Sequence, residues 1–493
     1  MYNNNRSSRQ EVREMILNSS VRFKTEDESI QKLFDTAKEK CLKNLKNFAG
    51  RPVLVEGGGY KKIWLETQPM GGEMYAKHNI EAALNNQLFF METQREDGRL
   101  AGSIEAKGEK VIEPQFNKFQ GFCFPFPALN MYYWIGKDDA YLDKLNNTLI
   151  GFDEYLWKTR DSNGDGCLES FCVYDTGEDN AVRYGDSPVY CTTDTPPKNS
   201  SIVPMESMDI MSFSYSARWA LAEISRIKNN GEYEAWAKKA QNVKKALKEH
   251  LWDEERGACY DKDKFGNVID VLTHNNLRCM YWGSFSQEMA DRFVCDHLTD
   301  PEKFWTFIPL PSVAANDPAF RNAPENNWSG QAEGLTYQRA IRALENYGYE
   351  KLVTKLGKKF MQCVIDGGYV FVQQYDPFTG VPSRVDPETK LVLPPESKKE
   401  AQDAYGPTLL AVLEYIAHIW GVHMQLGEIW FSLAGGLEYT YEQVWGENSY
   451  RIESDGKSAK VFVNDEEKFI SDTGVRLVTD ESGALVRKVR IED

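Results

Sequence analysis

The sequence has few of the residues and patterns that mark metalloenzymes, disulfide-bonded proteins and membrane proteins. Its six histidines show no H-E-x-x-H pattern and no clustering, so a catalytic zinc ion is not expected. Its nine cysteines are scattered singly without a C-x-x-C pair, as is typical of thiols in a reducing compartment. No segment approaches about eighteen consecutive apolar residues, and the N-terminus lacks an apolar leader. We therefore expect a cytoplasmic protein that requires no cofactor.

Positive charge is also scarce relative to negative charge. The chain has 58 Lys and Arg residues against 74 Asp and Glu residues, which gives a formal net charge of −16. Such a surface repels nucleic-acid phosphates and anionic lipids, so neither nucleic acid nor a membrane is expected as a partner. Hydrophobic residues make up 41% of the chain and aromatic residues 12%, which allows a large core and is compatible with stacking on sugar rings.

The 493 residues divide by pattern into a long helical part and a short β-rich part. Amphipathic segments recur in pairs between loops rich in Gly, Pro, Asn and Asp. After residue 426 the pattern changes to short alternating runs separated by turn residues. We expect a polar N-terminal arm over residues 1–25, a helical domain over 26–425 and a β-rich domain over 426–493. The predicted helices cover residues 28–46, 76–94, 119–135, 139–158, 208–228, 231–251, 286–298, 330–347, 349–366 and 401–420.

The loop after residue 158 carries oxygen ligands at alternate positions. Asp161, Asn163 and Asp165, followed by Gly166, are similar to the first half of a calcium-binding loop. The bidentate Glu at the twelfth position of such a loop is absent, because Cys172 stands there. A structural calcium ion and a plain turn of Asp, Asn and Gly are therefore both open.

A second acidic loop follows, in which Asp175, Glu178 and Asp179 lie close together and Arg183 comes shortly after. Like charges at this spacing destabilise one another unless one carboxyl stays neutral, and a raised carboxyl pKa is what a general acid needs. A solvated surface loop is the alternative interpretation. The loop nevertheless contains a candidate for acid catalysis.

Three further segments combine aromatic rings with amide and carboxylate side chains. They are residues 64–68, 326–337 and 373–380. Amides supply directional hydrogen bonds and rings supply an apolar platform, which together suit neutral polyhydroxylated ligands. A helix N-cap with a buried Trp is the alternative for 326–337. The glycine triplet before Trp64 lacks the Lys-Ser/Thr of a phosphate-binding loop.

Paired helices over roughly four hundred residues, interrupted by such loops, are what an (α/α)6 toroid of helical hairpins requires. The loops resemble, in order, motifs of the inverting glycosidases of the trehalase and glycoside hydrolase family 63 type. They are most similar to those of mannosylglycerate and glucosylglycerate hydrolase-like proteins. The resemblance implies a mainly α (α/α)6 toroid with a small C-terminal β appendage. The matching segments are residues 64–67 (family W-x-x-D-T), 94–98 (Q-x-x-D-G), 161–169 (D-x-x-G-D-G-L-x-E), 176–180 (S-G-M-D-N), 251–261 (LWDEE…YD), 328–330 (W-R-G) and 373–380 (E-x-Y-D-P-x-T-G).

The resemblance also implies catalytic roles, one of which this sequence does not fill. The general acid of the family is the Asp of S-G-M-D-N, which falls on Asp179. The general base is the Glu two residues before the Tyr of E-x-Y-D-P, and that position is Gln373 here. An amide has no useful basicity, so the base is not supplied where the family supplies it.

Four explanations of Gln373 are open. Another carboxylate, first Glu333 and then Glu66, could act as the base. Phosphate could be the nucleophile, which would make the protein an inverting phosphorylase. Gln373 could orient water in a slow enzyme, or the protein could bind sugar without turnover. A uronate lyase on the same toroid is disfavoured. That chemistry requires a Tyr/His pair and basic residues that neutralise the uronate, and the six histidines of this sequence are not clustered.

The resemblance therefore implies an inverting glycoside hydrolase whose partner is a small α-linked glucoside or mannoside. The sequence does not address the oligomeric state. The expected catalytic residues are Asp179, Glu333 and Gln373, the expected substrate-binding residues are Trp64, Glu66, Gln68, Glu178, Arg183, Trp328, Gln331 and Tyr375, and the calcium ligands are Asp161, Asn163 and Asp165.

Overall fold

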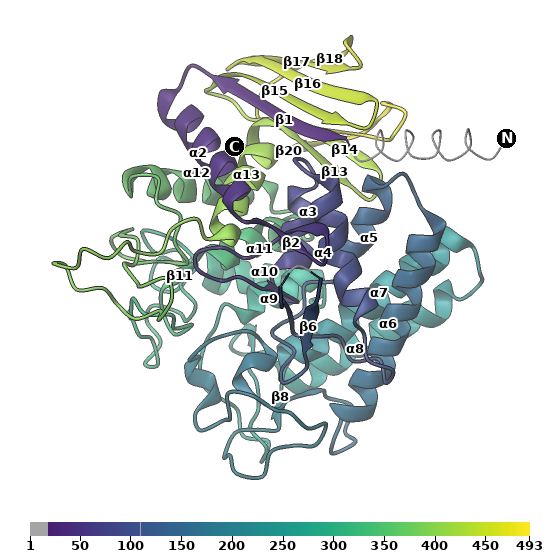
Figure 1. Cartoon of the computed structure of the whole chain (residues 1–493), viewed down its shortest axis with the longest axis vertical. Coiled ribbons are helices and arrows are strands. Elements are labelled where there is room, and N and C mark those ends of the chain that lie inside the picture. The colour runs from purple at the N-terminus through teal and green to yellow at the C-terminus, as the bar shows by residue number, and fades with distance from the viewer. Residues whose placement is uncertain (1–17, 109) are drawn as a thin grey trace.

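The computed structural model describes residues 18–108 and 110–493, and most of this chain forms a ring of helices (Figure 1). Within these residues, helices α3, α5, α7, α9, α11 and α13 each contact the next, and α13 contacts α3, which closes the ring. Helices α2, α4, α6, α8, α10 and α12 alternate with them along the chain and form the outer layer. The predicted (α/α)6 toroid is thereby confirmed. The inner helices are α3 (Gln68–Tyr75), α5 (Pro125–Trp134), α7 (Met208–Lys228), α9 (Asn275–Trp282), α11 (Gly334–Glu345) and α13 (Gly406–Trp420), and the outer ones are α2 (Glu28–Lys43), α4 (Ile80–Glu92), α6 (Asp139–Thr159), α8 (Tyr233–Leu251), α10 (Gln287–Phe293) and α12 (Glu350–Asp366).

The two layers differ in sequence as their surroundings require. In α13 every residue is buried, and its sequence GPTLLAVLEYIAHIW is apolar on almost all sides. In α2 only Leu33, Phe34, Ala37 and Cys41 are buried, which places one apolar stripe against the ring. Hydrophobic patterning therefore distinguishes α13 as an inner helix from α2 as an outer one.

Two inner helices were not predicted from the sequence. Neither α3 nor α9 is among the predicted helices. Every residue of α9 is buried, although it includes Asn275, Asn276 and Arg278. Polar residues that face the interior break the hydrophobic periodicity on which the prediction depends. Two predicted helices also start later than expected, because Pro occupies the first turn of both α5 and α13.

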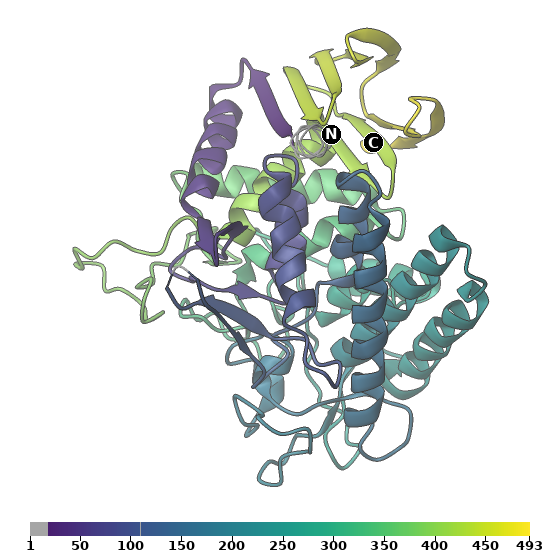
Figure 2. The ribbon, with the colours of Figure 1, turned by 45° about the vertical axis from the view of Figure 1, so that its right-hand side comes forward.

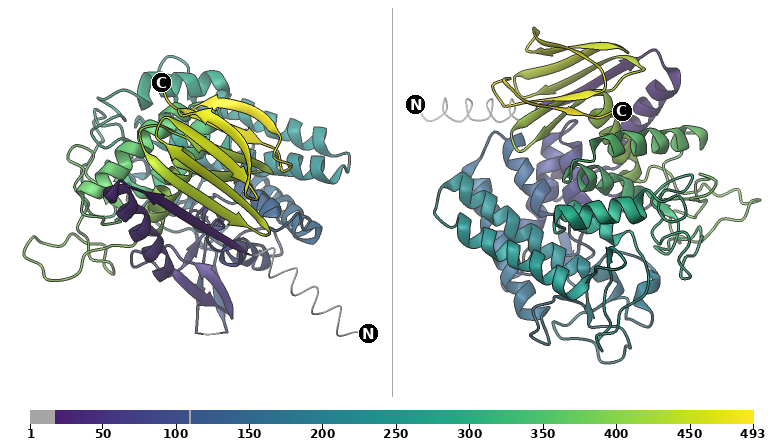
Figure 3. Two further views of the ribbon diagram at one scale, coloured as in Figure 1. Left: turned by 90° about the horizontal axis from the view of Figure 1, so that it is seen from above. Right: turned by 180° about the vertical axis from the view of Figure 1, so that it is seen from behind.

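Two antiparallel sheets cover one end of the ring (Figures 1 and 3). One has the order β13-β14-β19-β20 and the other the order β1-β15-β16-β17-β18. Contacts of β13 and β14 with β16 hold the two sheets together, and contacts of the same two strands with α13 attach them to the ring. The strands are β13 (Val422–Gln425), β14 (Glu428–Leu433), β15 (Glu438–Trp445), β16 (Asn448–Asp455), β17 (Ser458–Val463), β18 (Glu466–Asp472), β19 (Val475–Thr479) and β20 (Leu485–Arg490).

The N-terminal arm differs from the expectation in its last residues. Residues 1–17 lie outside the described part of the chain. Ser19–Thr25 form strand β1, which pairs antiparallel with β15 over its whole length. Val21 and Phe23 point inward in alternation with exposed residues, so the strand contributes to the apolar interior. The division of the chain into domains stays a prediction.

The other end of the ring carries long loops and short strand pairs (Figures 1 and 2). The loop between β7 (Glu169–Ser170) and β8 (Met205–Glu206) lies there, opposite the sheets. The remaining short strands are β2 (Leu45–Phe48), β3 (Arg51–Leu54), β4 (Ile63–Trp64), β5 (Ser103–Ala106), β6 (Ile112–Gln115), β9 (Trp252–Asp253), β10 (Ala258–Cys259), β11 (Ala332–Glu333) and β12 (Gln374–Tyr375). In the described part of the chain, no helix is both long enough and apolar enough to cross a membrane.

A buried ion pair between α3's C-terminal end and α13 provides a test of this packing. Lys77 Nζ lies 2.7 Å and 2.9 Å from the two carboxylate oxygens of Glu414, and both side chains are 2% exposed. Replacing Lys77 by Met leaves a buried carboxylate without its main partner, which should lower the free energy of unfolding by about 3–5 kcal/mol. The exposed pair of Lys245 with Glu249 is the matched control, and Lys245→Met should cost under about 1 kcal/mol. Equal losses in chemical denaturation would contradict this account.

Candidate active site

A polar pocket of about 190 Å³ opens among the loops at the end of the ring away from the sheets. It is small compared with the roughly 300–1,000 Å³ of typical ligand pockets, which favours a compact ligand. Aromatic rings, amides, one lysine and three carboxyls line it together. The lining residues are Glu56, Tyr60, Trp64, Glu66, Lys118, Gln120, Tyr174, Gly177, Asp179, Tyr190, Trp328, Leu335, Gln373 and Tyr405.

The glycine triplet shapes one wall of this pocket. Gly57, Gly58 and Gly59 all have positive φ angles, of 77°, 59° and 91°. Residues with a side chain rarely adopt this backbone conformation, whereas glycine adopts it readily. The three glycines therefore allow the chain to turn sharply here. Gly57 and Tyr60 exchange backbone hydrogen bonds of 3.1 Å and 2.9 Å across the turn. The turn thereby presents Glu56 and Tyr60 to the pocket from its two sides.

Asp179 reaches the pocket from the loop between β7 and β8. The backbone N–H of Trp328 donates to the carbonyl of Asp179 at 2.9 Å, and Ser329 Oγ donates to the carbonyl of Asn180 at 2.9 Å. Gly177 is required just before it, because a Cβ there would lie 2.3 Å from Glu66 Oε2. Loop 176–180 is therefore fixed against loop 326–329.

A chain of hydrogen bonds connects Asp179 with Gln373. Asn326 Nδ2 donates to Asp179 Oδ2, and Gln373 Nε2 donates to Asn326 Oδ1 at 3.0 Å. Tyr60 Oη donates to Gln373 Oε1 at 2.9 Å. The structure therefore brings the expected acid and the expected position of the base into one network, with only neutral groups between them.

The carboxyl groups of the pocket hold protons more tightly than free ones. Burial raises the pKa of Asp179 to about 6, against hydrogen bonds from Asn326 and Tyr174 that favour its ionised form. Burial and the charge of Glu66 raise the pKa of Glu56 to about 8. Lys118 is the lysine that lines the pocket, and burial lowers its pKa to about 8. At neutral pH the pair of Asp179 and Glu56 therefore retains about one proton, which these pKa values place mostly on Glu56.

Beneath the pocket lies a buried network of arginines and carboxylates. Arg183 contacts Glu178, Asp209 and Asp261. Arg278 lies 3.2 Å from both Glu178 and Asp209. Although burial opposes ionisation, Arg183 and Arg278 hold the pKa of Glu178 well below its usual range. The network also includes Glu66 with Arg339, and Glu178 with His274 at 2.9 Å.

The predicted substrate-binding residues divide into two groups. Trp64, Glu66 and Trp328 line the pocket, as does Gln373, which was predicted as a catalytic position. The others do not line it, and each has a structural partner. Glu178 and Arg183 belong to the buried ion network, Gln68 Oε1 accepts from the Trp64 backbone at 2.7 Å, Gln331 Nε2 donates to Asn322 at 3.0 Å, and Tyr375 Oη donates to the Val370 carbonyl at 3.0 Å.

Glu333, the first candidate for a replacement base, lies next to the pocket but does not line it. Its side chain is fully buried, and Oε1 accepts from Gln374 Nε2 at 2.8 Å. Its other oxygen has no hydrogen-bond partner among the described residues. Glu66 does line the pocket, but Arg339 donates to its Oε1 and Arg278 lies 3.5 Å from the same atom.

The predicted calcium loop is held by its own hydrogen bonds. Asp161 Oδ1 accepts from the Gly166 backbone at 3.2 Å, and Asp165 Oδ1 accepts from the Cys167 backbone at 2.8 Å. Asn163 donates to Asp165 Oδ2 at 2.7 Å. These bonds account for the spacing as a turn, and calcium binding at this loop stays a prediction.

Several pocket residues were missed from the sequence, notably Glu56, Tyr60, Lys118, Tyr174 and Tyr405. The one local signal is the glycine triplet beside Glu56 and Tyr60, which from the sequence was compared only with a phosphate-binding loop. The other three come from separate loops and carry no motif. Only the closure of the ring brings them to one place.

A family sequence model supports the same assignment. The model described as the mannosylglycerate hydrolase MGH1-like glycoside hydrolase domain matches residues 66–389. The cytosolic neutral trehalase of Kluyveromyces lactis is 26% identical over 160 residues. That match spans 31% of this chain and only 21% of the trehalase.

Solved structures share the fold at low sequence identity. The family 63 mannosylglycerate hydrolase of Thermus thermophilus, in complex with glucose, has a TM-score of 0.60 and 17% identity. The match covers 78% of this chain and 99% of that one. Neutral trehalase from Saccharomyces cerevisiae has a TM-score of 0.53 and 13% identity, over 75% and 74% of the two chains. The chain therefore belongs to the mannosylglycerate hydrolase MGH1-like family of glycoside hydrolases.

Proposed function

We propose that the protein hydrolyses a small α-linked glycoside with inversion at the anomeric carbon, and that Asp179 is the general acid. The observation that carries this proposal is the position and pKa of Asp179. It lines a compact polar pocket, and burial raises its pKa to about 6, so it can hold a proton for the leaving oxygen near neutral pH. Its place in the chain also matches the acid of the family motif.

The pocket offers a suitable platform for one sugar ring. Trp64 and Trp328 line it, and aromatic faces stack on the C–H faces of sugars. Trp64 Nε1 is buried without a hydrogen-bond partner in the described residues, so it is available to donate to a hydroxyl. The amide of Gln373 lies across the network from Asp179. Gln373 in this proposal positions a hydroxyl or water and removes no proton.

Inverting hydrolysis needs a second carboxylate to activate water, at roughly 6.5–9.5 Å from the acid. We assign this role to Glu56, since it lines the same pocket as Asp179. Neither arginine nor lysine forms an ion pair with it among the described residues, and Tyr405 Oη donates to its Oε1 at 3.1 Å. Glu66 is instead paired with Arg339, and Glu333 is shielded from the pocket. Glu333 remains the second candidate.

Two substitutions with two substrates test these roles. Asp179→Asn should lower kcat by about 10²–10⁴-fold on an ordinary glycoside, because the leaving oxygen is no longer protonated. On an α-glycosyl fluoride the loss should shrink to about tenfold or less, because fluoride leaves with little protonation. Glu56→Gln should lose activity on both substrates, since water activation is needed for each. Rates are measured by product release.

Glu333→Gln is the matched control for Glu56→Gln. It also removes one buried carboxyl near Asp179, yet it should retain activity on both substrates if it only supports the pocket. Parental turnover in Asp179→Asn on the ordinary glycoside would refute the acid. If Glu333→Gln loses both activities while Glu56→Gln retains them, the base is Glu333.

The same carboxyl pair predicts the pH dependence of hydrolysis. Below about pH 6 both Asp179 and Glu56 are protonated, so no base is present. Above about pH 8 both are ionised, so no acid is present. Between these values the pair holds one proton, and the active form, with Asp179 protonated and Glu56 ionised, is a minor fraction in equilibrium with the form protonated on Glu56. The profile of kcat/KM should therefore be bell-shaped with its maximum near pH 7, and Asp179→Asn or Glu56→Gln should each leave a single limb. A wild-type profile that stays flat between pH 5 and 9 would contradict this.

Phosphorolysis is a second candidate, favoured by the buried ammonium group of Lys118 beside Asp179. The same cation suits an anionic aglycone such as the glycerate of the compound that the Thermus relative is named for. α-Glucosyl and α-mannosyl glycerates, glycerols and disaccharides should be incubated with and without phosphate. Hydrolysis independent of phosphate, giving the β-anomer first, is expected. A glycosyl phosphate product would identify a phosphorylase, and saturable binding without any product would identify a sugar-binding protein.

A further inference from the structure

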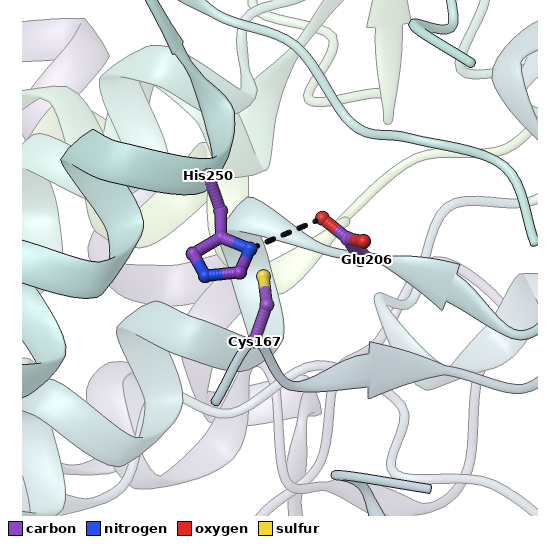
Figure 4. A group of neighbouring side chains, drawn as sticks. All are labelled: Cys167, Glu206 and His250. Atoms are coloured by element: carbon purple, nitrogen blue, oxygen red, sulfur yellow. Dashed lines mark ion pairs between the residues drawn. The ribbon is translucent and has the colours of Figure 1, made fainter. Parts of the chain in front are cut away.

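Three potential metal ligands converge outside the pocket, beside the short sheet of β7 and β8. Cys167 precedes β7, Glu206 lies in β8 and His250 lies near the end of α8, and their side chains point toward one another (Figure 4). One ligand atom of each lies within 4.8 Å of the other two. The three residues are separated by roughly forty positions each in the chain, so only the fold brings them together.

The spacing of these atoms fits a small tetrahedral ion. His250 Nδ1 lies 3.6 Å from Glu206 Oε2. Zinc binds sulfur at about 2.3 Å and nitrogen or oxygen at about 2.0–2.2 Å in a tetrahedron, which places neighbouring ligand atoms about 3.3–3.8 Å apart. The separation is too long for a hydrogen bond and has the length of one edge of such a tetrahedron.

The local hydrogen bonding also leaves these atoms free for an ion. Glu206 Oε2 is buried and has no hydrogen-bond partner among the described residues. Its nearest cation besides His250 is Lys262, whose Nζ lies 3.8 Å away and whose side chain is 26% exposed. A buried carboxylate oxygen without a donor is unfavourable, and a cation between the three side chains would satisfy it.

The second cluster of this kind in the described chain is different. Glu414, His418 and His423 also lie within reach of one ion. There, however, Lys77 donates to both oxygens of Glu414, and His418 Nδ1 lies 2.9 Å from Glu345. Two of its three members, Glu414 and His418, therefore already have strong partners inside the protein, so the cluster at Cys167 is the better candidate.

We propose that Cys167, Glu206 and His250 bind a structural zinc ion, with a fourth position left for water. Thiolate, imidazole and carboxylate together are a donor set that zinc prefers, whereas calcium and magnesium select oxygen ligands. The two anionic ligands balance the charge of a divalent ion. Since His250 is 26% exposed, the ion can enter from solvent.

Backbone hydrogen bonds fix the chain around this site. Ser207 N donates to the Leu168 carbonyl at 3.0 Å, and Lys262 N donates to the Glu206 carbonyl at 3.2 Å. Glu169 and Ser170 pair with Glu206 and Met205 in the sheet. Glu206 is therefore held within β8, and Cys167 is held two residues before the strand that pairs with it, before the ion arrives, which lowers the cost of binding.

The site lies where the two ends of the loop that carries Asp179 come together. That loop leaves β7 at residue 170 and returns in β8 at residue 205. An ion held by Cys167 and Glu206 would fasten its two ends together, and His250 would fasten both to α8. Cross-linking the ends of a loop limits the conformations that the unfolded chain can adopt and stabilises the closed form. This role is independent of the proposed hydrolysis.

Zinc binding to the full chain, first stripped with a chelator, tests the proposal. Titration calorimetry and elemental analysis should show one tightly bound zinc ion, and saturating zinc should raise the Tm by about 2–4 °C. Glu206→Gln and His250→Gln should each weaken zinc binding by at least about tenfold. With cobalt in place of zinc, a sulfur-to-cobalt charge-transfer band should appear and should be absent from Cys167→Ser.

Cys295→Ser is the matched control, since Cys295 is the exposed thiol of the described chain and could itself capture metal. It should retain the wild-type affinity, Tm shift and cobalt band. Far-UV circular dichroism of each metal-free variant confirms folding. No zinc bound by the wild type, or zinc bound equally well by His250→Gln and Glu206→Gln, would overturn the proposal. A cobalt band lost in Cys295→Ser would assign the metal to the other thiol.

Discussion

The site depends on a buried network in which Arg183, Arg278 and Arg339 compensate the carboxylates beneath the pocket. Arg183 and Arg278 tie the loop from β7 to β8 to the inner helices α7 and α9. Arg339 on α11 pairs with Glu66, which lies just before α3. Removing charges from water is costly unless the pairs are close and well hydrogen-bonded, so the network tolerates few other arrangements. Glu178 and Asp179 are neighbours in sequence with opposite outcomes. Glu178 pairs with arginines, which lower its pKa and keep it ionised. Asp179 faces the pocket and accepts from neutral donors, and burial raises its pKa.

In the proposed hydrolysis the pocket works without a Glu at position 373, and the same principle accounts for this. Gln373, Asn326 and Asp179 form a hydrogen-bonded chain that needs no charge at its far end. A second carboxyl enters the pocket from a different segment, at Glu56, and burial raises its pKa as well. Two carboxyls that share about one proton at neutral pH are what acid and base catalysis require of a pair. A loop beside a glycine turn can therefore supply chemistry that the resemblance assigns to another loop.

The fold separates support from chemistry at the two ends of one ring. The sheets cover one end, where Arg476 on β19 pairs with Glu345 on α11 at 2.7 Å. The loops at the other end carry the pocket residues, and short strand pairs fix their bases. Inner helices that are buried on all sides form a rigid frame, because close packing leaves little room for movement. Loops fixed to such a frame can hold isolated polar groups at defined positions.

The toroid, the β-rich C-terminal part and the candidacy of Asp179 follow from the amino-acid sequence, because hydrophobic periodicity and local motifs are properties of neighbouring residues. Helix α9 and the partners of Glu178 and Arg183 could not be predicted from the sequence. Polar residues that point inward are indistinguishable in sequence from polar residues on a surface. The role of Glu56 in the pocket and the cluster of Cys167, Glu206 and His250 could not be predicted from the sequence for a related reason. Their members are distant in the chain, and scattered histidines and cysteines show no spacing. Which of them meet depends on the folded chain, because the packing of the helices brings separate loops together.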